Sequence, residues 1–106
     1  MATVTQEQYL VGQIHTIKKS NTKHGPRVEM ILDVLTTTLD NIANKSVQVI
    51  AWGDQAEATK HFARHGLSFV TIKRTKVSKF NGRPITQVIP DKIMKSSHRE
   101  LEIFRG

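Results

Sequence analysis

The stretch "SVQVIAWGDQAEATKHFARHGLSFVTI", residues 46–72, decides the fold because the spacing of its apolar residues changes twice. Residues 46–52 are rich in β-branched side chains and predict a strand. Asp54 and Glu57 then have the spacing of a helix N-cap and its capping-box partner, and Gly66 is suited to end that helix. The residues that follow return to a strand pattern. One helix of about three turns is therefore expected between two strands.

Two further strands are expected upstream of this stretch. Residues 9–18 are rich in β-branched side chains and predict a long strand, with Gly12 as a bulge or bend. Residues 27–35 alternate between apolar and polar side chains and predict a second strand. Residues 19–26 are dense in Ser, Asn, Gly and Pro, which indicates a loop between the two strands.

The last third of the chain predicts a hairpin and a second helix. Residues 67–77 indicate the fourth strand, and residues 83–90, closed by Pro90, indicate the fifth. Between them, Asn81-Gly82 is a strong signal for a type I′ turn, whose two central residues both need positive φ. The stretch "SSHRELEIF", residues 96–104, resembles a short helix with capping-box spacing.

The order of these elements favours an all-β class, a five-stranded OB-fold barrel. Five antiparallel strands in one domain of residues 1–106 leave costly open edges unless the sheet closes. A helix between strands three and four is the OB-fold order, and a C-terminal helix follows it. A split barrel or an α+β sandwich is the alternative, which the helix position disfavours. Residues 1–8 are expected to be flexible, and residues 91–106 to form a C-terminal extension.

Positive charge is concentrated in two stretches of the chain. Sixteen Lys and Arg stand against nine Asp and Glu, a formal net charge of +7 that favours a polyanionic partner. Residues 18–28 and residues 67–89 each contain several Lys and Arg residues and no Asp or Glu. They fall on the first-second loop, on strand four and on the fourth-fifth loop, which flank the OB-fold groove. The candidate phosphate contacts are Lys18, Lys19, Lys23, Arg27, Lys73, Arg74, Lys76, Lys79 and Arg83.

Two of the six aromatic residues are candidates for stacking on unpaired bases. Trp52 ends the third strand, where a core position is equally compatible with the pattern. Phe80 adjoins the Asn81-Gly82 turn and is flanked by Lys79 and Arg83, which disfavours a core role. We expect this turn to lie beside the groove, alongside Trp52 and opposite the first basic loop. Phe62 and Phe69 are expected in the core.

The segments "VIAWGDQAEA" (49–58) and "VTIKRTKVSKFNGRPI" (70–85) resemble a known family. They are similar to the second high-affinity DNA-binding OB domain of the large subunit of replication protein A, the eukaryotic and archaeal single-stranded DNA-binding protein. The resemblance covers residues 47–106 well and the first half in strand order alone. It implies that Trp52 and Phe80 stack on bases. The family's subunit has several domains, whereas this chain predicts one. It also lacks the acidic C-terminal tail by which bacterial single-stranded DNA-binding proteins recruit partners, so a minimal phage or mobile-element protein is also considered.

Catalytic and metal chemistry find little support in the sequence. His61 and His65 are four residues apart on the expected helix, but no third ligand is evident. Asp33, Asp40 and Asp54 form no recognisable pair for metal-assisted hydrolysis, and the glycines are too scattered for a phosphate loop. The chain has no cysteine, which excludes disulfides and thiolate metal sites. We therefore expect a protein that is not an enzyme and has no cofactor or metal.

The sequence thus predicts single-stranded DNA binding and protection, with little sequence preference, in replication, recombination or repair. An RNA- or tRNA-binding OB domain is one alternative, and an OB subunit of a protein complex is another. Replication or recombination proteins and a second copy of the chain are considered as further partners, whereas a membrane or a small-molecule substrate is not expected. The expected location is the cytoplasm for a prokaryotic or phage protein and the nucleus for a eukaryotic one.

Overall fold

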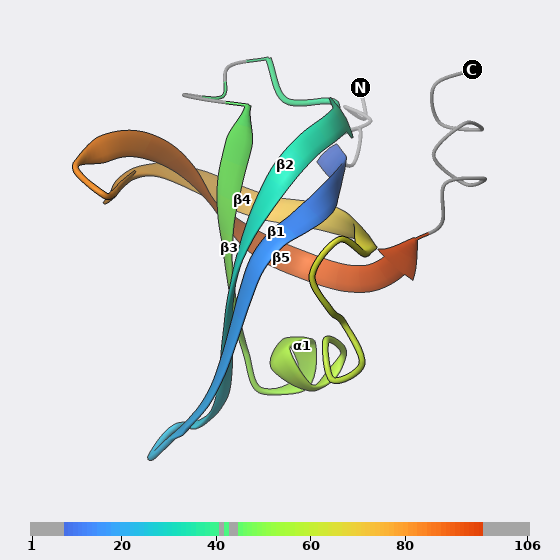
Figure 1. The fold of residues 1–106 in the computed structure, drawn as a ribbon. Coiled ribbons are helices and arrows are strands. Elements are labelled where there is room, and N and C mark those ends of the chain that lie inside the picture. Colours follow the sequence, from blue (N-terminus) through green and yellow to red (C-terminus); the bar gives the residue numbers. More distant parts are fainter. Residues whose placement is uncertain (1–7, 41, 43–44, 97–106) are drawn as a thin grey trace, which may run out of the picture.

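The computed structural model describes residues 8–40, 42 and 45–96, and these form a closed five-stranded barrel (Figure 1). The barrel order is β1-β2-β3-β5-β4, and β1 closes it by pairing with both β2 and β4. All pairings are antiparallel except that of β3 with β5. The elements are β1 (Gln8–Thr22), β2 (Gly25–Thr37), β3 (Ser46–Trp52), α1 (Asp54–Glu57), β4 (Leu67–Phe80) and β5 (Arg83–Ser96). This arrangement confirms the predicted all-β class and is consistent with an OB-fold-like barrel.

The core lies inside the barrel and is formed by alternate residues of every strand. Its fully buried members include Leu10, Ile14, Met30, Leu32, Val47, Val49, Val70 and Val88. Phe62 is buried in the same cluster, as expected. Phe69 is partly buried, and its ring stacks on that of Tyr9 with centroids 5.5 Å apart. In β2, the apolar residues that alternate with polar ones in the sequence, Val28, Met30 and Leu32, are those that face the core.

Gly12 lies at a bulge, as predicted, where β1 bends to pair with two neighbours. The register of β1 with β2 shifts between Val11 and Gly12 and again between Ile14 and Thr16. A Cβ on Gly12 would lie 2.9 Å from the Cβ of Leu32 and 3.1 Å from the carbonyl oxygen of Asp33. Glycine is needed here because β2 approaches the backbone too closely for any side chain.

Both hairpins are longer than the sequence predicts, and both project from the barrel (Figure 1). β1 and β2 run on to a tight turn at Lys23 and His24, so the loop expected at residues 19–26 is wrong. β4 reaches Phe80, and β5 continues past Pro90 to Ser96 into the expected C-terminal extension. We call the two projections the β1–β2 arm (residues 18–28) and the β4–β5 arm (residues 74–89).

The helix is shorter than predicted. α1 ends at Glu57, and its N-cap is Gly53, which makes no side-chain capping bond, rather than Asp54. The chain beyond α1 bonds to β1 instead: the amide of His65 donates to the Ile14 carbonyl, and the Ile14 amide donates to Gly66, each at 2.8 Å. These tertiary hydrogen bonds override the helix propensity of the chain beyond α1. Gly66 was expected to end the helix, but the residue with a left-handed backbone conformation is His65, whose φ is 71°.

Both ends of the described chain belong to strands. Gln8 already belongs to β1, whereas residues 1–7 lie outside the described residues. The helix expected at residues 96–104 begins with Ser96, which is the last residue of β5, and the remainder also lies outside them. Within the described part of the chain, no helix is long and apolar enough to cross a membrane.

Candidate nucleic-acid interface

The outer side of β2 and β3 forms one continuous face between the two arms. Its residues are those that alternate with the core, and the strand register sets them side by side as Arg27 with Trp52, Glu29 with Ile50, Ile31 with Gln48, and Asp33 with Ser46. We call this surface the outer β2–β3 face. It corresponds to the strand 2–3 face on which OB-folds bind oligonucleotides or oligosaccharides.

Trp52 lies at one end of this face and is exposed. Its side chain retains 47% of its accessible surface, so the core position that the sequence left open is wrong. The guanidinium of Arg27 lies 5.6 Å from the centre of the indole ring, a cation–π contact. Arg27 Nη1 also donates to Glu29 Oε2 at 3.5 Å. The Arg27 side chain is thus held against one side of the indole ring.

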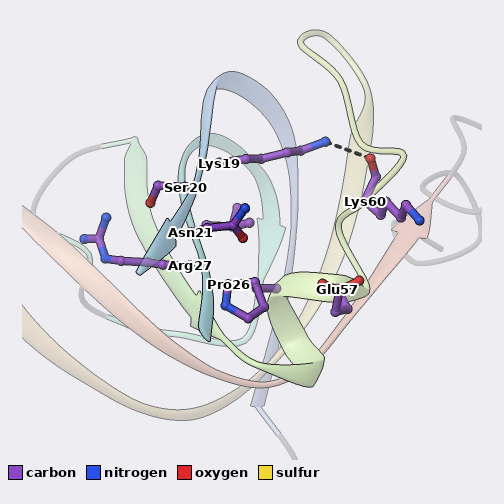
Figure 2. A pocket seen from close by; sticks show the side chains of 9 residues that line it. Lys19, Ser20, Asn21, Pro26, Arg27, Glu57 and Lys60 are labelled. Carbon is purple, nitrogen blue, oxygen red and sulfur yellow. Dashed lines mark hydrogen bonds between the residues drawn. The ribbon is translucent and has the colours of Figure 1, made fainter. Parts of the chain in front are cut away.

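A cleft of about 390 Å³ lies between the β1–β2 arm and α1 (Figure 2). Figure 2 shows Lys19 extending toward Lys60, while Arg27 extends away from it. The Lys19 ammonium donates to the carbonyl oxygens of Lys60 (2.8 Å) and Phe62 (3.3 Å). Lys19 therefore links the β1–β2 arm to the chain after α1. The sequence predicted a phosphate contact for Lys19 and did not predict this structural role.

Phe80 lies at the other end of the outer β2–β3 face. Asn81 and Gly82 both have positive φ, 51° and 77°, which confirms the predicted type I′ turn. This turn pairs Phe80 directly with Arg83. The ring is 39% exposed and lines a second cleft of about 330 Å³. The other residues of this cleft are His15, Ile31, Asp33, Ser46, Arg83, Pro84 and Ile85.

The two rings are separated by the length of β3. Phe80 shares a cleft with Ser46, the first residue of β3, whereas Trp52 is its last. At about 3.3 Å per residue, this separation is roughly 20 Å. The expectation that the Phe80 turn lies alongside Trp52 is therefore wrong. The rings instead mark opposite ends of one face.

The predicted cations divide between two sides of the β4–β5 arm. Arg74 and Lys76 are in register with Ile89 and Gln87, on the same side of the strand as Phe80. Lys79, between Ser78 and Phe80, points to the opposite side by strand alternation. Lys73 lies at a break in register, between Ile72 and Arg74. Arg83, rather than Lys79, is thus the cation that accompanies Phe80.

Besides Lys19 and Arg27, the β1–β2 arm carries Lys18 on β1 and Lys23 at its tip. Lys23 is exposed in the turn at the tip. Lys18 is exposed and in register with Glu29, next to the outer β2–β3 face. Together with the cations of the other arm, they place positive charge around the outer β2–β3 face and not in its middle.

The middle of the outer β2–β3 face carries a hydrogen-bonded row that sequence reasoning missed. Gln87 Nε2 donates to Gln48 Oε1 at 2.8 Å, and Gln48 Nε2 donates to Glu29 Oε1 at 2.6 Å. The two glutamines are only 7% and 6% exposed, for Gln48 and Gln87 respectively. Strand alternation could have predicted the position of Gln48, because Gln48 and Trp52 are an even number of residues apart in β3 and therefore point to the same side. The row fixes Glu29, which in turn fixes Arg27 beside the indole.

Asp33 is a second carboxylate on this face. Its Oδ1 accepts a hydrogen bond from Ser46 Oγ at 2.8 Å, and its Oδ2 lies 3.8 Å from His15 Nδ1. Glu29 in the middle of the face and Asp33 toward its Phe80 end are acidic, while the arms are basic. A bound polyanion would therefore keep its phosphates toward the arms.

The structure does not support a metal site at His61 and His65. His61 and His65 follow the end of α1 and are both exposed, so they do not share a helical face. Within residues 8–40, 42 and 45–96, no group of three or more His, Cys, Asp or Glu side chains is arranged to hold a metal ion.

Comparisons with known proteins identify the fold. No protein-family model matches this chain, and a search of curated proteins finds no significant match. Among solved structures, the chain is similar to the small single-stranded DNA-binding protein from Streptomyces coelicolor, with a TM-score of 0.66 and 20% sequence identity. The match covers 92% of this chain and 97% of that one. The likeness supports the OB-fold-like barrel over nearly its whole length, without specific support for the replication protein A family.

Proposed function

We propose that this protein binds single-stranded DNA without catalysing a reaction and with little sequence preference. The observation that carries the proposal is the pair of exposed rings, Trp52 and Phe80, each beside an arginine at opposite ends of the outer β2–β3 face. Unpaired bases stack on exposed rings, and basic arms attract the backbone. The structural likeness to a protein described as single-stranded DNA-binding supports the same reading.

Each set of residues has a distinct role in this proposal. Trp52 and Phe80 stack on bases, while Asn81 and Gly82 hold the turn that presents Phe80. Phosphates are contacted from the two arms, and Lys19 contributes less because its ammonium already has two carbonyl partners. The remaining proposed phosphate contacts are Lys18, Lys23, Arg27, Lys73, Arg74, Lys76, Lys79 and Arg83. We place the activity in replication, recombination or repair, in the compartment that holds the DNA.

Fluorescence of Trp52, the sole tryptophan, tests this function directly. Titration with oligo-dT is expected to quench the emission, whereas duplex of equal length binds much more weakly because its bases are already stacked. Raising the salt concentration should lower the affinity for oligo-dT steeply, since phosphate contacts release counterions. Equal affinity for duplex would point to an unspecific basic surface. Tighter binding of oligo-rU than of oligo-dT would favour the RNA alternative.

Replacing Phe80 with alanine is expected to weaken oligo-dT binding by about 5- to 30-fold, the lower part of the range for one stacked base. The measurement is a titration with labelled oligo-dT at constant salt. Val77→Ala is the matched control, because Val77 is 77% exposed on the opposite side of the same arm. An equal loss in both variants would mean that the arm, and not the ring, contributes the affinity.

A further inference from the structure

The cleft beside Phe80 combines a ring, apolar walls and a carboxylate. Ile31, Pro84 and Ile85 form apolar walls, and Asp33 and Ser46 form a polar edge. Its volume of about 330 Å³ is at the lower end of small-molecule sites, which span ~300–1,000 Å³. Space of this size is sufficient for one planar ring system and too small for a longer segment of polymer.

Asp33 retains the capacity to accept further hydrogen bonds. An ionised carboxylate offers about four lone-pair positions and has no donor. Ser46 Oγ occupies one position on Oδ1, and His15 Nδ1 is too distant, at 3.8 Å, to be a hydrogen-bond donor to Oδ2. The side chain of Asp33 is 49% exposed. A ligand in the cleft that offers an N–H group to this carboxylate is therefore favoured over one that offers only acceptors.

Charge determines which part of a nucleotide enters the cleft. The Asp33 carboxylate repels a phosphate, while Arg83, paired across the turn with Phe80, attracts one at the cleft edge. This arrangement orients the backbone outward and the base inward. The base then lies within reach of both the Phe80 ring and Asp33.

We propose that this cleft binds a single nucleobase and prefers cytosine to thymine, with Phe80 stacking on the ring and Asp33 accepting the exocyclic amine. The proposal rests on the single-stranded DNA binding proposed above and adds base selectivity at one position. Cytosine presents an N4 amine as a donor where thymine presents the O4 acceptor. Thymine would instead place its O4 acceptor against the Asp33 carboxylate, which is itself an acceptor.

Competition between oligo-dC and oligo-dT tests the proposal. With strands of about 16 nucleotides, the upper site size for one OB domain, oligo-dC is expected to bind about fivefold tighter, the lower limit for a specific base contact. Asp33→Asn should bring the ratio close to one. Asp91→Asn is the matched control, because it removes the same charge from an exposed residue of β5 that does not line the cleft. This control should keep the wild-type ratio.

A second ligand makes the test independent of any variant. Oligonucleotides that carry 2-pyrimidinone, which is cytosine without its amine, should lose the advantage of oligo-dC on the wild-type protein. Equal wild-type affinities for oligo-dC and oligo-dT would overturn the base preference while leaving the proposed function standing. Failure to bind either strand would overturn the function itself. A ratio unchanged in Asp33→Asn would show that Asp33 is not the acceptor.

Discussion

Replacing Trp52 with alanine is expected to weaken single-strand binding by about 5- to 150-fold, equivalent to 1–3 kcal/mol for one stacked base. The fold should be retained, because the indole is 47% exposed and contributes little to the core. Its loss removes one cation–π contact with Arg27, worth about 0.5–1 kcal/mol at an exposed site. The measurement is fluorescence anisotropy of a labelled oligo-dT, since the variant has no tryptophan of its own.

Trp52→Phe is the control for this experiment. It keeps a flat ring at the same position, so most of the affinity should return. If Trp52→Ala binds as tightly as the wild type, the indole does not stack on a base. If Trp52→Phe is as weak as Trp52→Ala, the specific contact between Arg27 and the indole matters more than the presence of a ring.

Gly12→Val is expected to destabilise the barrel by about 1–3 kcal/mol, the usual cost of overpacking. A Cβ at this position meets the Cβ of Leu32 at 2.9 Å and the carbonyl oxygen of Asp33 at 3.1 Å, and β2 has to shift to accommodate it. For a domain of this size, the melting temperature should fall by roughly 4–8 °C per kcal/mol. Thermal unfolding followed by circular dichroism measures the change.

Thr16→Val on the same strand controls for a β-branched apolar side chain in β1. Thr16 is exposed, so this variant should melt close to the wild type. If Gly12→Val were as stable as Thr16→Val, β2 would be able to move away from the bulge at no cost. Because Asp33 lies next to Leu32, Gly12→Val should also disturb the cleft beside Phe80.

The features that sequence predicted well are those set by local rules. β3 was predicted to its exact bounds, Ser46–Trp52, because its alternation is flanked by polar turn residues on one side and Gly53 on the other. The turn at Asn81 and Gly82 was predicted because only a few residue types accept positive φ in succession. The bulge at Gly12 belongs to the same class of local signal.

The features that sequence missed depend on distant partners. Toward their tips, at residues 18–24 and 76–84, the two arms are mostly exposed, so these parts of the strands lack the apolar alternation by which a half-buried strand is recognised. Residues 58–66 have a helical sequence pattern, but hydrogen bonds to Ile14 and His15 hold this segment against β1 instead. Such bonds form only when the barrel has brought the two segments together.

The candidate site was predicted in composition and missed in geometry. Trp52 and Phe80 are predicted from their residue type and from the charges beside Phe80. That the length of β3 separates them follows only from the strand order. Lys19 looked like any other cation until its carbonyl partners placed it against the segment after α1. Asp33 and Gln48 lacked any motif, because their proximity to Phe80 and Glu29 arises from the pairing of different strands.

The parallel pairing of β3 with β5 has a consequence for how the barrel opens. It joins Val47–Val49 to Thr86–Val88 and is the shortest of the five pairings. One side-chain hydrogen bond, from Gln87 Nε2 to Gln48 Oε1, reinforces this seam. Its β3 residues lie between Ser46, which shares a cleft with Phe80, and Trp52. Because the proposed DNA strand would bind the closed barrel and not an opened one, we expect bound DNA to shift the equilibrium away from the open seam.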